Sequence, residues 1–279
     1  MFNVWKMECY RMVRMKSFYV IALVLVAMTF LTTFTLHMEY TNPNIQEAQQ
    51  KLAEEAGTDM NFTVGISVES LENDGTEVTH MDLIRNNLGA GAVSCFFAIF
   101  VVLFCAEEYS GGFIKNYAGQ ISNRMQIVFA RSLAVAVYTV AMTIWYVILQ
   151  LVSDLIFFGN IAMGEHMLGY CGLQTLLSIA LMLIIMLVVT AVRSTSISMV
   201  VSLAISWQMT SLLYMGIEKL LDVIGVSDVH ITEYTISGTM RALSDALTQG
   251  ECMKAIGVAL AYLVGACAIS GVVFTKRDI

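Results

Sequence analysis

Charge and proline are both scarce in this chain, and each shortage excludes a class of protein. Charged residues make up 13% of its 279 residues, against about 25% in a typical soluble domain, while 57% are hydrophobic. A single proline leaves little of the turn chemistry that a protein built from many short strands needs. An ordinary soluble domain is therefore excluded, and the composition indicates an integral membrane protein.

Motifs of catalysis are missing as well. The sequence contains no HExxH, no GxSxG and no GxxxxGK(S/T), so it signals no metalloprotease, no serine hydrolase and no nucleotide-binding loop. The four histidines lack metal-ligand spacing. A disulfide between Cys171 and Cys252 is conceivable but not expected. We therefore expect this chain to contain no catalytic residue and to bind no cofactor or metal ion itself.

Long hydrophobic runs, by contrast, recur along the chain. Six runs of about 20 residues have the length of a helix that crosses a hydrocarbon core of about 30 Å, whereas the strands of a membrane barrel have about 10 residues. We therefore predict an all-α, polytopic membrane protein with six transmembrane helices. The predicted spans are residues 18–37, 88–106, 128–158, 168–192, 197–217 and 255–274.

Lysine and arginine predict the orientation of these spans, because cytoplasmic segments retain positive charge. With the N-terminus inside, the inner segments carry Lys6, Arg11, Arg14, Lys16, Lys115, Arg124, Arg131, Arg193, Lys276 and Arg277. The outer segments carry only Lys51, Arg85, Lys219, Arg241 and Lys254. Both termini are therefore predicted to be cytoplasmic, with residues 107–127, 193–196 and 275–279. Residues 38–87, 159–167 and 218–254 are then extracellular, and no basic tract suggests a nucleic-acid partner.

The first 17 residues are predicted to form an amphipathic helix in the membrane interface. Its apolar face would comprise Phe2, Trp5, Cys9, Met12 and Val13. Glu8, Arg11 and Arg14 would face away, with the basic residues towards anionic headgroups. The alternative is a basic leader that only sets topology. We do not expect a cleaved signal peptide, because the apolar run from Phe18 is longer than a typical signal-peptide core.

The two large extracellular segments differ in character. Residues 38–87 predict a solvated loop with a helix near residues 44–56 and a short strand near residues 62–68. A substrate gate or partner site is the alternative for this segment. Residues 218–254 have short apolar stretches on both sides of a polar break, which predicts interfacial or re-entrant helices.

Two features stand out inside the predicted spans. Asp154 is an ionisable group near the outer end of the third span, with Gln150 one turn before it; it is either functional or reaches the interface. Small residues gather at the outer end of the second span, where they predict a close approach of helices. They are Gly89, Gly91, Ala92 and Ser94.

Residues 107–127 are the polar stretch around which the chain is organised. Hydrophobic runs enter and leave it at its ends, so it forms a compact feature at a membrane surface. Tyr109, Phe113 and Tyr117 recur every four residues and would share one face of a helix. The other face would carry Glu108, Gly112 and Lys115. Aromatic side chains rimmed by charges suit a protein interface, and an ordinary inner loop is the alternative.

The same stretch carries a resemblance to a known family. Its residues are Glu107-Glu108-Tyr109, Gly112-Phe113-Ile114-Lys115-Asn116, Ile121-Ser122-Asn123-Arg124 and Gln126-Ile127. They resemble the E-x-x-x-G-x-I-K-N...I-S-R-x-Q-I pattern of permease subunits of type-two ATP-binding-cassette exporters. The resemblance extends to the six-span plan, the amphipathic N-terminal helix, the outer helices before the last span and the short basic tail. Asn123 departs from the family pattern.

This resemblance implies a half-transporter in a cell membrane of bacterial type. Two permease chains, alike or different, would pair, and separate cytoplasmic ATPase subunits would bind ATP and magnesium. The permease itself would not be an enzyme. The ATPase would dock on Glu107, Glu108, Tyr109, Gly112, Phe113, Lys115, Asn116 and Tyr117. Family habit implies a peptide or hydrophobic small molecule as cargo.

Two other classes of function remain as alternatives. An ion-coupled secondary transporter is expected to show paired broken spans and buried charges near the membrane midplane, and we predict neither here. A membrane-anchored sensor would carry its information in the extracellular segment and would need few spans. Six predicted spans and the lack of a cytoplasmic signalling domain argue against it.

Overall fold

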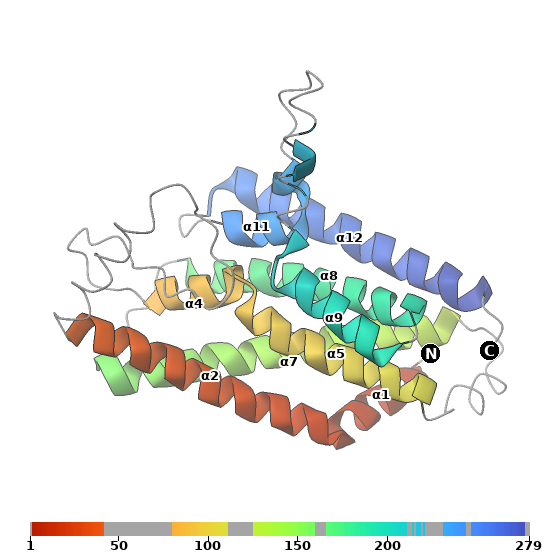
Figure 1. Cartoon of the computed structure of the whole chain (residues 1–279), viewed down its shortest axis with the longest axis horizontal. Helices are drawn as coiled ribbons and strands as arrows, with labels where there is room; N and C mark the ends of the chain where they lie inside the picture. The colour runs from red at the N-terminus through yellow and green to blue at the C-terminus, as the bar shows by residue number, and fades with distance from the viewer. Residues whose placement is uncertain are drawn as a thin grey trace.

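A computed structural model describes the chain at residues 2–41, 80–110, 125–159, 166–192, 194–210, 214, 216–218, 220, 231–243 and 247–276. Within these ranges all regular elements are helices (Figure 1). The prediction of an all-α fold is confirmed within these ranges. The helix and strand predicted within residues 44–56 and 62–68 lie outside the described residues.

The described helices follow one another along the chain, with further helical residues at 210, 214, 216–218 and 220. In order they are α1 (Phe2–Arg14), α2 (Lys16–Thr41), α4 (His80–Gly89), α5 (Ala92–Ser110), α7 (Met125–Phe158), α8 (Met167–Val192), α9 (Thr195–Ser206), η1 (Ile231–Tyr234), α11 (Ile236–Ala242) and α12 (Gln249–Lys276). The long helices lie lengthwise beside one another (Figure 1).

Within the described ranges, four helices are long and apolar enough to cross a membrane. They are Lys16–Met38 in α2, Met125–Phe158, Met167–Val192 and Gln249–Val273 in α12. Each coincides with a predicted span, and α7, with 34 residues, is about 51 Å long at 1.5 Å per residue and so exceeds a core of about 30 Å.

The second predicted span is divided into two helices. α4 and α5 pass the same test together but are bent by 43° at the break between them. Gly91, in that break, has a φ of +83°, which lies in the left-handed region that glycine adopts without a steric cost. The predicted close approach is confirmed here, because a Cβ on Gly91 would overlap the backbone carbonyl oxygen of Ser206 at the end of α9.

The fifth predicted span is not one uninterrupted helix. α9 has 12 residues, about 18 Å of helix, which is too short to cross the hydrocarbon core. It ends at Ser206, and the chain turns at Trp207–Met209, where Gln208 has a φ of 59°. The span predicted over residues 197–217 is therefore interrupted by this turn, and Thr210 is helical again. The count of six spans stays a prediction.

Helix α9 follows α8 and runs along part of the bundle (Figure 1). We call the end of the bundle that contains α1 and the last turns of α12 the termini end, and the opposite end the distal end (Figure 1). α8 runs towards the termini end and α12 begins near the distal end (Figure 1). α9 begins near the termini end and runs back towards the middle of the bundle (Figure 1).

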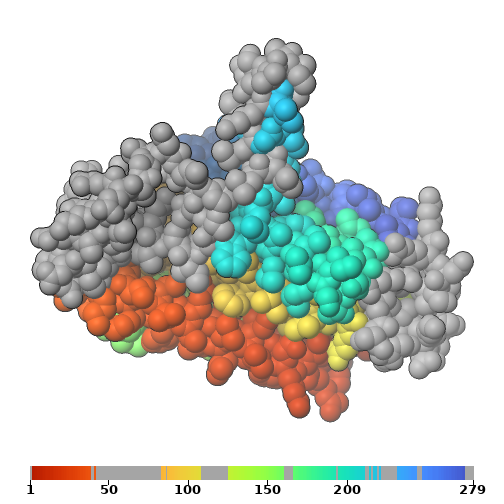
Figure 2. All heavy atoms as spheres, in the orientation of Figure 1, coloured from red at the N-terminus to blue at the C-terminus, as the bar shows by residue number. Residues whose placement is uncertain are grey.

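Helix α8 lies at the centre of the packing. It contacts α12, α7, α5 and α9, while α2 packs against α7 and α5. The outer faces of the bundle stay apolar: α2 and α9 form much of the face in Figure 2, and their exposed side chains include Leu23, Leu31, Ile197 and Val200. Apolar side chains on the outside of long apolar helices are the pattern of a lipid-facing surface.

Candidate functional site

The predicted docking residues begin in the last turn of α5. Glu107, Glu108 and Tyr109 belong to this helix, which ends at Ser110, and the side chain of Glu107 is exposed. The other predicted residues lie outside the described part of the chain: Gly112, Phe113, Lys115, Asn116 and Tyr117. The aromatic face predicted from their spacing therefore stays a prediction.

The helices on both sides of this stretch are firmly packed. Phe104 and Cys105 in α5 are fully buried, and so is Ala130 in α7. Ile127, two residues after the start of α7, is 1% exposed. A displacement of residues 111–124 would therefore act directly on two core helices, because well-packed interiors transmit strain.

Helix α1 is docked on the same end of α5. The guanidinium carbon of Arg11 lies 4.3 Å from the centroid of the Phe104 ring, within the range of a cation–π interaction. Nη2 of Arg11 also donates a long, 3.4 Å hydrogen bond to the Phe104 carbonyl oxygen. The same nitrogen is 3.0 Å from the carboxylate of Glu8.

The predicted orientation of α1 is wrong in part. Glu8 was expected to face away from the apolar face, but it is fully buried, whereas Phe2 and Val13 are exposed. Met12 is buried, and Trp5 packs partly buried against the core. The inward face therefore includes a carboxylate, which the Arg11 guanidinium makes tolerable by pairing with it.

Burial of Glu8 also affects its neighbour Cys9. The pKa of the Cys9 thiol is raised, first because the thiol is partly buried and second because the Glu8 carboxylate is nearby. Both effects disfavour the thiolate. Cys9 is therefore a poor nucleophile and a poor metal ligand, in line with its predicted role as a small apolar side chain.

A stack of aromatic rings leads from Phe104 into the bundle. Phe104 and Phe100 are stacked with centroids 5.9 Å apart, and Phe100 stacks on Tyr138 of α7 at 4.1 Å. Phe18, at the start of α2, packs edge-on against both Phe100 and Tyr138 at 5.9 and 6.1 Å. These rings join α5, α7 and α2 directly behind the end of α5.

Arg131 is a buried cation that the hydropathy pattern did not single out. It lies in the second turn of α7, and it is 2% exposed and the largest fully buried side chain. Its neighbour Ser132 faces α8 and α12, with Oγ 3.9 Å from the sulfur of Met186 and 3.8 Å from Sγ of Cys267. The sequence signal that could have singled out Arg131 was its position, four residues after the end of the polar stretch at residue 127.

At the distal end a polar cluster lies between α2 and α7. Gln150 is its centre: Nε2 donates to Oγ1 of Thr33 at 3.1 Å and to Oδ1 of Asp154 at 2.9 Å, and Oε1 accepts from the Tyr146 hydroxyl at 3.3 Å. Gln150 and Asp154 are both fully buried. Asp154 therefore points into the protein, and the alternative in which it reaches the membrane interface is wrong.

A second polar cluster surrounds the break between α4 and α5. Nε2 of Gln208 donates to the carbonyl oxygen of Gly89 at 2.5 Å. Nε2 of Gln174 in α8 donates to the carbonyl oxygen of Met240 in α11 at 2.7 Å and to the Tyr170 hydroxyl at 3.0 Å. The break is therefore tied to the end of α9, and α11 is tied to α8.

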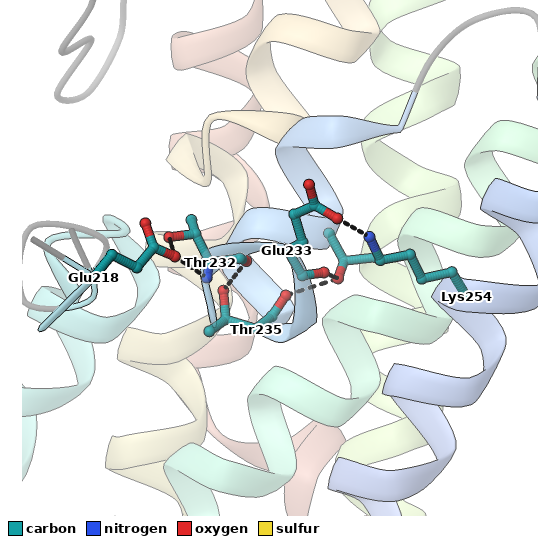
Figure 3. Close-up of polar contacts among 6 residues, drawn as sticks. Glu218, Thr232, Glu233, Thr235 and Lys254 are labelled. Carbon is teal, nitrogen blue, oxygen red and sulfur yellow. Dashed lines mark hydrogen bonds and ion pairs between the residues drawn. The ribbon is translucent and has the colours of Figure 1, made fainter. Parts of the chain in front are cut away.

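Hydrogen bonds and an ion pair hold α11 in place (Figure 3). The Glu218 carboxylate accepts from both the backbone nitrogen and Oγ1 of Thr232, each at 2.7 Å. Thr235 caps α11 by accepting from the Gly238 nitrogen at 3.1 Å, the role expected of a threonine at this position. An ion pair joins Glu233 to Lys254 of α12. The short helices predicted before the last span are present, and α11 packs against α4, α8 and α12.

The described ranges show neither a metal site nor a disulfide. No group of three or more His, Cys, Asp or Glu side chains in them could hold a metal ion. All six cysteines are free, so Cys171 and Cys252 are not bonded to each other. The polar groups instead form contacts between helices.

Comparison with known proteins identifies no relative. No protein-family model matches the chain, and no curated protein matches it in sequence. The resemblance to exporter permeases therefore depends on the residues of the polar stretch and on the helical plan.

Proposed function

We propose that this chain is the membrane-spanning permease subunit of an ATP-driven exporter in a bacterial cell membrane. A separate cytoplasmic ATPase subunit binds ATP and magnesium and docks on residues 107–127. A second permease chain, identical or different, completes the translocation path. The observation that carries this proposal is the family-like motif in the connection between α5 and α7.

The arrangement at the termini end supports the proposal. α5 and α7 enter and leave the motif as packed helices. α1 packs mainly against α7 and reaches α5 through Arg11 and Phe104. The excess of lysine and arginine in the termini-end segments supports a cytoplasmic position for this end. An ATPase that binds there would act on three helices at once.

The path of the chain supports the plan of an exporter permease. Within the described residues four helices qualify as spans, the bent pair α4–α5 adds a fifth candidate, and α9 is a shorter apolar helix. The cargo that fits the family resemblance is a peptide or a hydrophobic small molecule.

Purification of the intact chain from its own cells tests this proposal. A cytoplasmic ATPase should co-purify with the wild-type chain. Phe113→Ala and Glu108→Ala should leave the chain folded and inserted but weaken docking by more than about tenfold, because truncating one anchor at an interface commonly costs about 2 kcal/mol. Glu54→Ala and Glu55→Ala, on the predicted extracellular side, are the matched controls and should keep the ATPase bound.

Two results would contradict the proposal. One is a wild-type chain that never brings an ATPase with it. The other is normal docking and normal export in both Phe113→Ala and Glu108→Ala, which would show that residues 107–127 are not the coupling element.

An ion-coupled secondary transporter is the second candidate, and one group of observations favours it. Sequence reasoning predicted neither broken spans nor buried charges, but α4 and α5 are bent by 43°, and Asp154 and Arg131 are buried. Buried carboxylates in membrane helices often carry protons or ions. In this case the purified chain alone would support a proton or sodium flux in liposomes, and Asp154→Asn would abolish that flux.

A further inference from the structure

The contact between Arg11 and Phe104 joins two elements that are 93 residues apart in the sequence. The guanidinium lies over the ring at 4.3 Å and also reaches the main-chain oxygen of the same residue. A cation held by both the face of a ring and a carbonyl oxygen is fixed in position and in direction. α1 packs mainly against α7, and Arg11 links it to the last turns of α5.

Burial of Glu8 shows that this docking is more than a surface contact. A carboxylate in α1 could pair with Arg11 one turn away while both stay in water. Here Glu8 is fully buried and 18% of the Arg11 side chain is exposed. Removing a carboxylate from water is costly unless a paired cation and further contacts compensate. The Glu8–Arg11 pair is therefore part of the packed interface between α1 and the bundle.

Phe104 connects this interface to the interior. Its ring stacks on Phe100, and Phe100 in turn stacks on Tyr138 and contacts Phe18. Phe100 and Phe104 are 1% and 0% exposed. Buried rings in contact cannot move independently, because the interior is close-packed. A shift of Phe104 is therefore passed to α7 and to the start of α2.

We propose that Arg11 is a positioning residue for energy coupling: it holds α1 and the end of α5 together as one unit, so that movement of the docking stretch enters the stack Phe104–Phe100–Tyr138. This inference rests on the proposed function, because it assumes that an ATPase docked on residues 107–127 causes the movement. It adds a role for α1 and for the aromatic stack, both of which lie outside residues 107–127.

Hydrogen–deuterium exchange on the complete permease–ATPase complex in lipid nanodiscs tests this role. Arg11→Ala should speed amide exchange in α1 by about tenfold, as expected for loss of one cation–π contact with its ion pair. Arg14→Ala is the matched control: Arg14 is an exposed arginine on the same helix, and its guanidinium bonds the Tyr10 hydroxyl at 3.2 Å within α1. Arg14→Ala should leave exchange in α1 unchanged, and Arg11→Lys should give an intermediate rate.

A second readout separates positioning from simple stability. Adding magnesium–ATP to the wild-type complex should change exchange at the start of α2 and in the first turns of α7. In Arg11→Ala the ATPase should still co-purify in full, but the nucleotide-dependent change in α2 and α7 should be lost. Phe104→Leu should give the same loss, and the double variant should be no worse than either single variant.

The outcomes that overturn the proposal are distinct. If Arg11→Ala behaves like Arg14→Ala in both readouts, Arg11 does not join α1 to α5. If α1 exchanges faster while the nucleotide response still reaches α2 and α7, the contact is structural only. Failure of the proposed function itself is recognised separately, because the wild-type complex would then lack the ATPase or any nucleotide response. Should Arg11→Ala fail to fold, Phe104→Leu and Arg11→Lys decide by the same measurements.

Discussion

Replacing Gly91 by alanine should destabilise the protein through two independent effects. The residue has a φ of +83°, a conformation that costs an L-residue about 1–2 kcal/mol relative to glycine. In addition, an added Cβ would overlap the carbonyl oxygen of Ser206 and lie 3.4 Å from Cγ of Gln208. The carbonyl belongs to the backbone at the end of α9, so it can move away only if that helix moves.

The movement of α9 would itself have a cost. It would strain or break the hydrogen bond from Gln208 to the carbonyl oxygen of Gly89, and a buried hydrogen bond contributes about 0.5–1.5 kcal/mol. The combined loss for Gly91→Ala is therefore about 1.5–3.5 kcal/mol. Gly91→Leu should lose more, because overpacking adds about 1–3 kcal/mol, and it should weaken assembly as well as stability.

Reversible unfolding in mixed micelles, followed by circular dichroism, measures this effect. The matched control is Gly257→Ala in α12, where an added Cβ meets no heavy atom within 4 Å and the change should be neutral or stabilise by about 0.5–1 kcal/mol. Gly89→Ala is a second control, since its nearest neighbour would be 3.4 Å away, an ordinary contact. Equal stability of Gly91→Ala and Gly257→Ala would refute the reasoning.

Three further predictions follow, the first from the sequence and the other two from the structure. A cysteine engineered near Gly75 should be labelled from outside the cell and one at Asn116 should not; the reverse pattern would contradict the orientation. Burial of the thiol and the nearby Glu8 carboxylate raise the pKa of Cys9, so this thiol should react with maleimide at pH 7.5 more slowly than an ordinary exposed thiol. Glu8→Gln should speed the reaction. A reaction rate that does not change in Glu8→Gln would count against the buried carboxylate. Gln174→Met should cost about 1–3 kcal/mol in the unfolding assay, because it leaves a buried carbonyl of α11 without its donor; wild-type stability would show that α11 does not depend on this bond.

The long helices could be predicted from the sequence because their signal is local. The predicted spans 18–37, 168–192 and 255–274 correspond to α2, α8 and α12, which differ from them mainly by extra turns at the ends. A run of about 20 apolar residues is enough to define a spanning helix. The helix continues at both ends into the membrane interface, where hydropathy does not define the residue at which it stops.

The breaks in helices could not be predicted in the same way. Hydropathy averages over a window, so the turn at Gly91 and the turn after Ser206 both disappear into apolar surroundings. The left-handed conformations of Gly91 and Gln208 are visible only when the neighbouring backbone is in place. The small residues near Gly89 did predict a close approach, because they leave room for another backbone, but not which helix would approach.

The orientation of Glu8 was missed for a related physical reason. An amphipathic pattern assigns a carboxylate to the polar face by default. Whether it can be buried depends on a cation at the right distance and on a surface that accepts both, here Arg11 and the Phe104 ring. The candidate docking site was predicted from its motif alone, and its described part is confined to the last turn of α5.

The last turns of α5 and the end of α4 just before it are each held through a main-chain carbonyl oxygen. At the termini end Arg11 reaches the carbonyl oxygen of Phe104, and at the break Gln208 reaches that of Gly89. Every residue has a carbonyl, so the sequence of the accepting helix carries no trace of either contact. The specificity lies with the distant donor, 93 and 119 residues away respectively. Substitutions of these two donors should therefore disturb the position of α5 more than conservative substitutions at the accepting residues, whose carbonyl groups remain whatever the side chain.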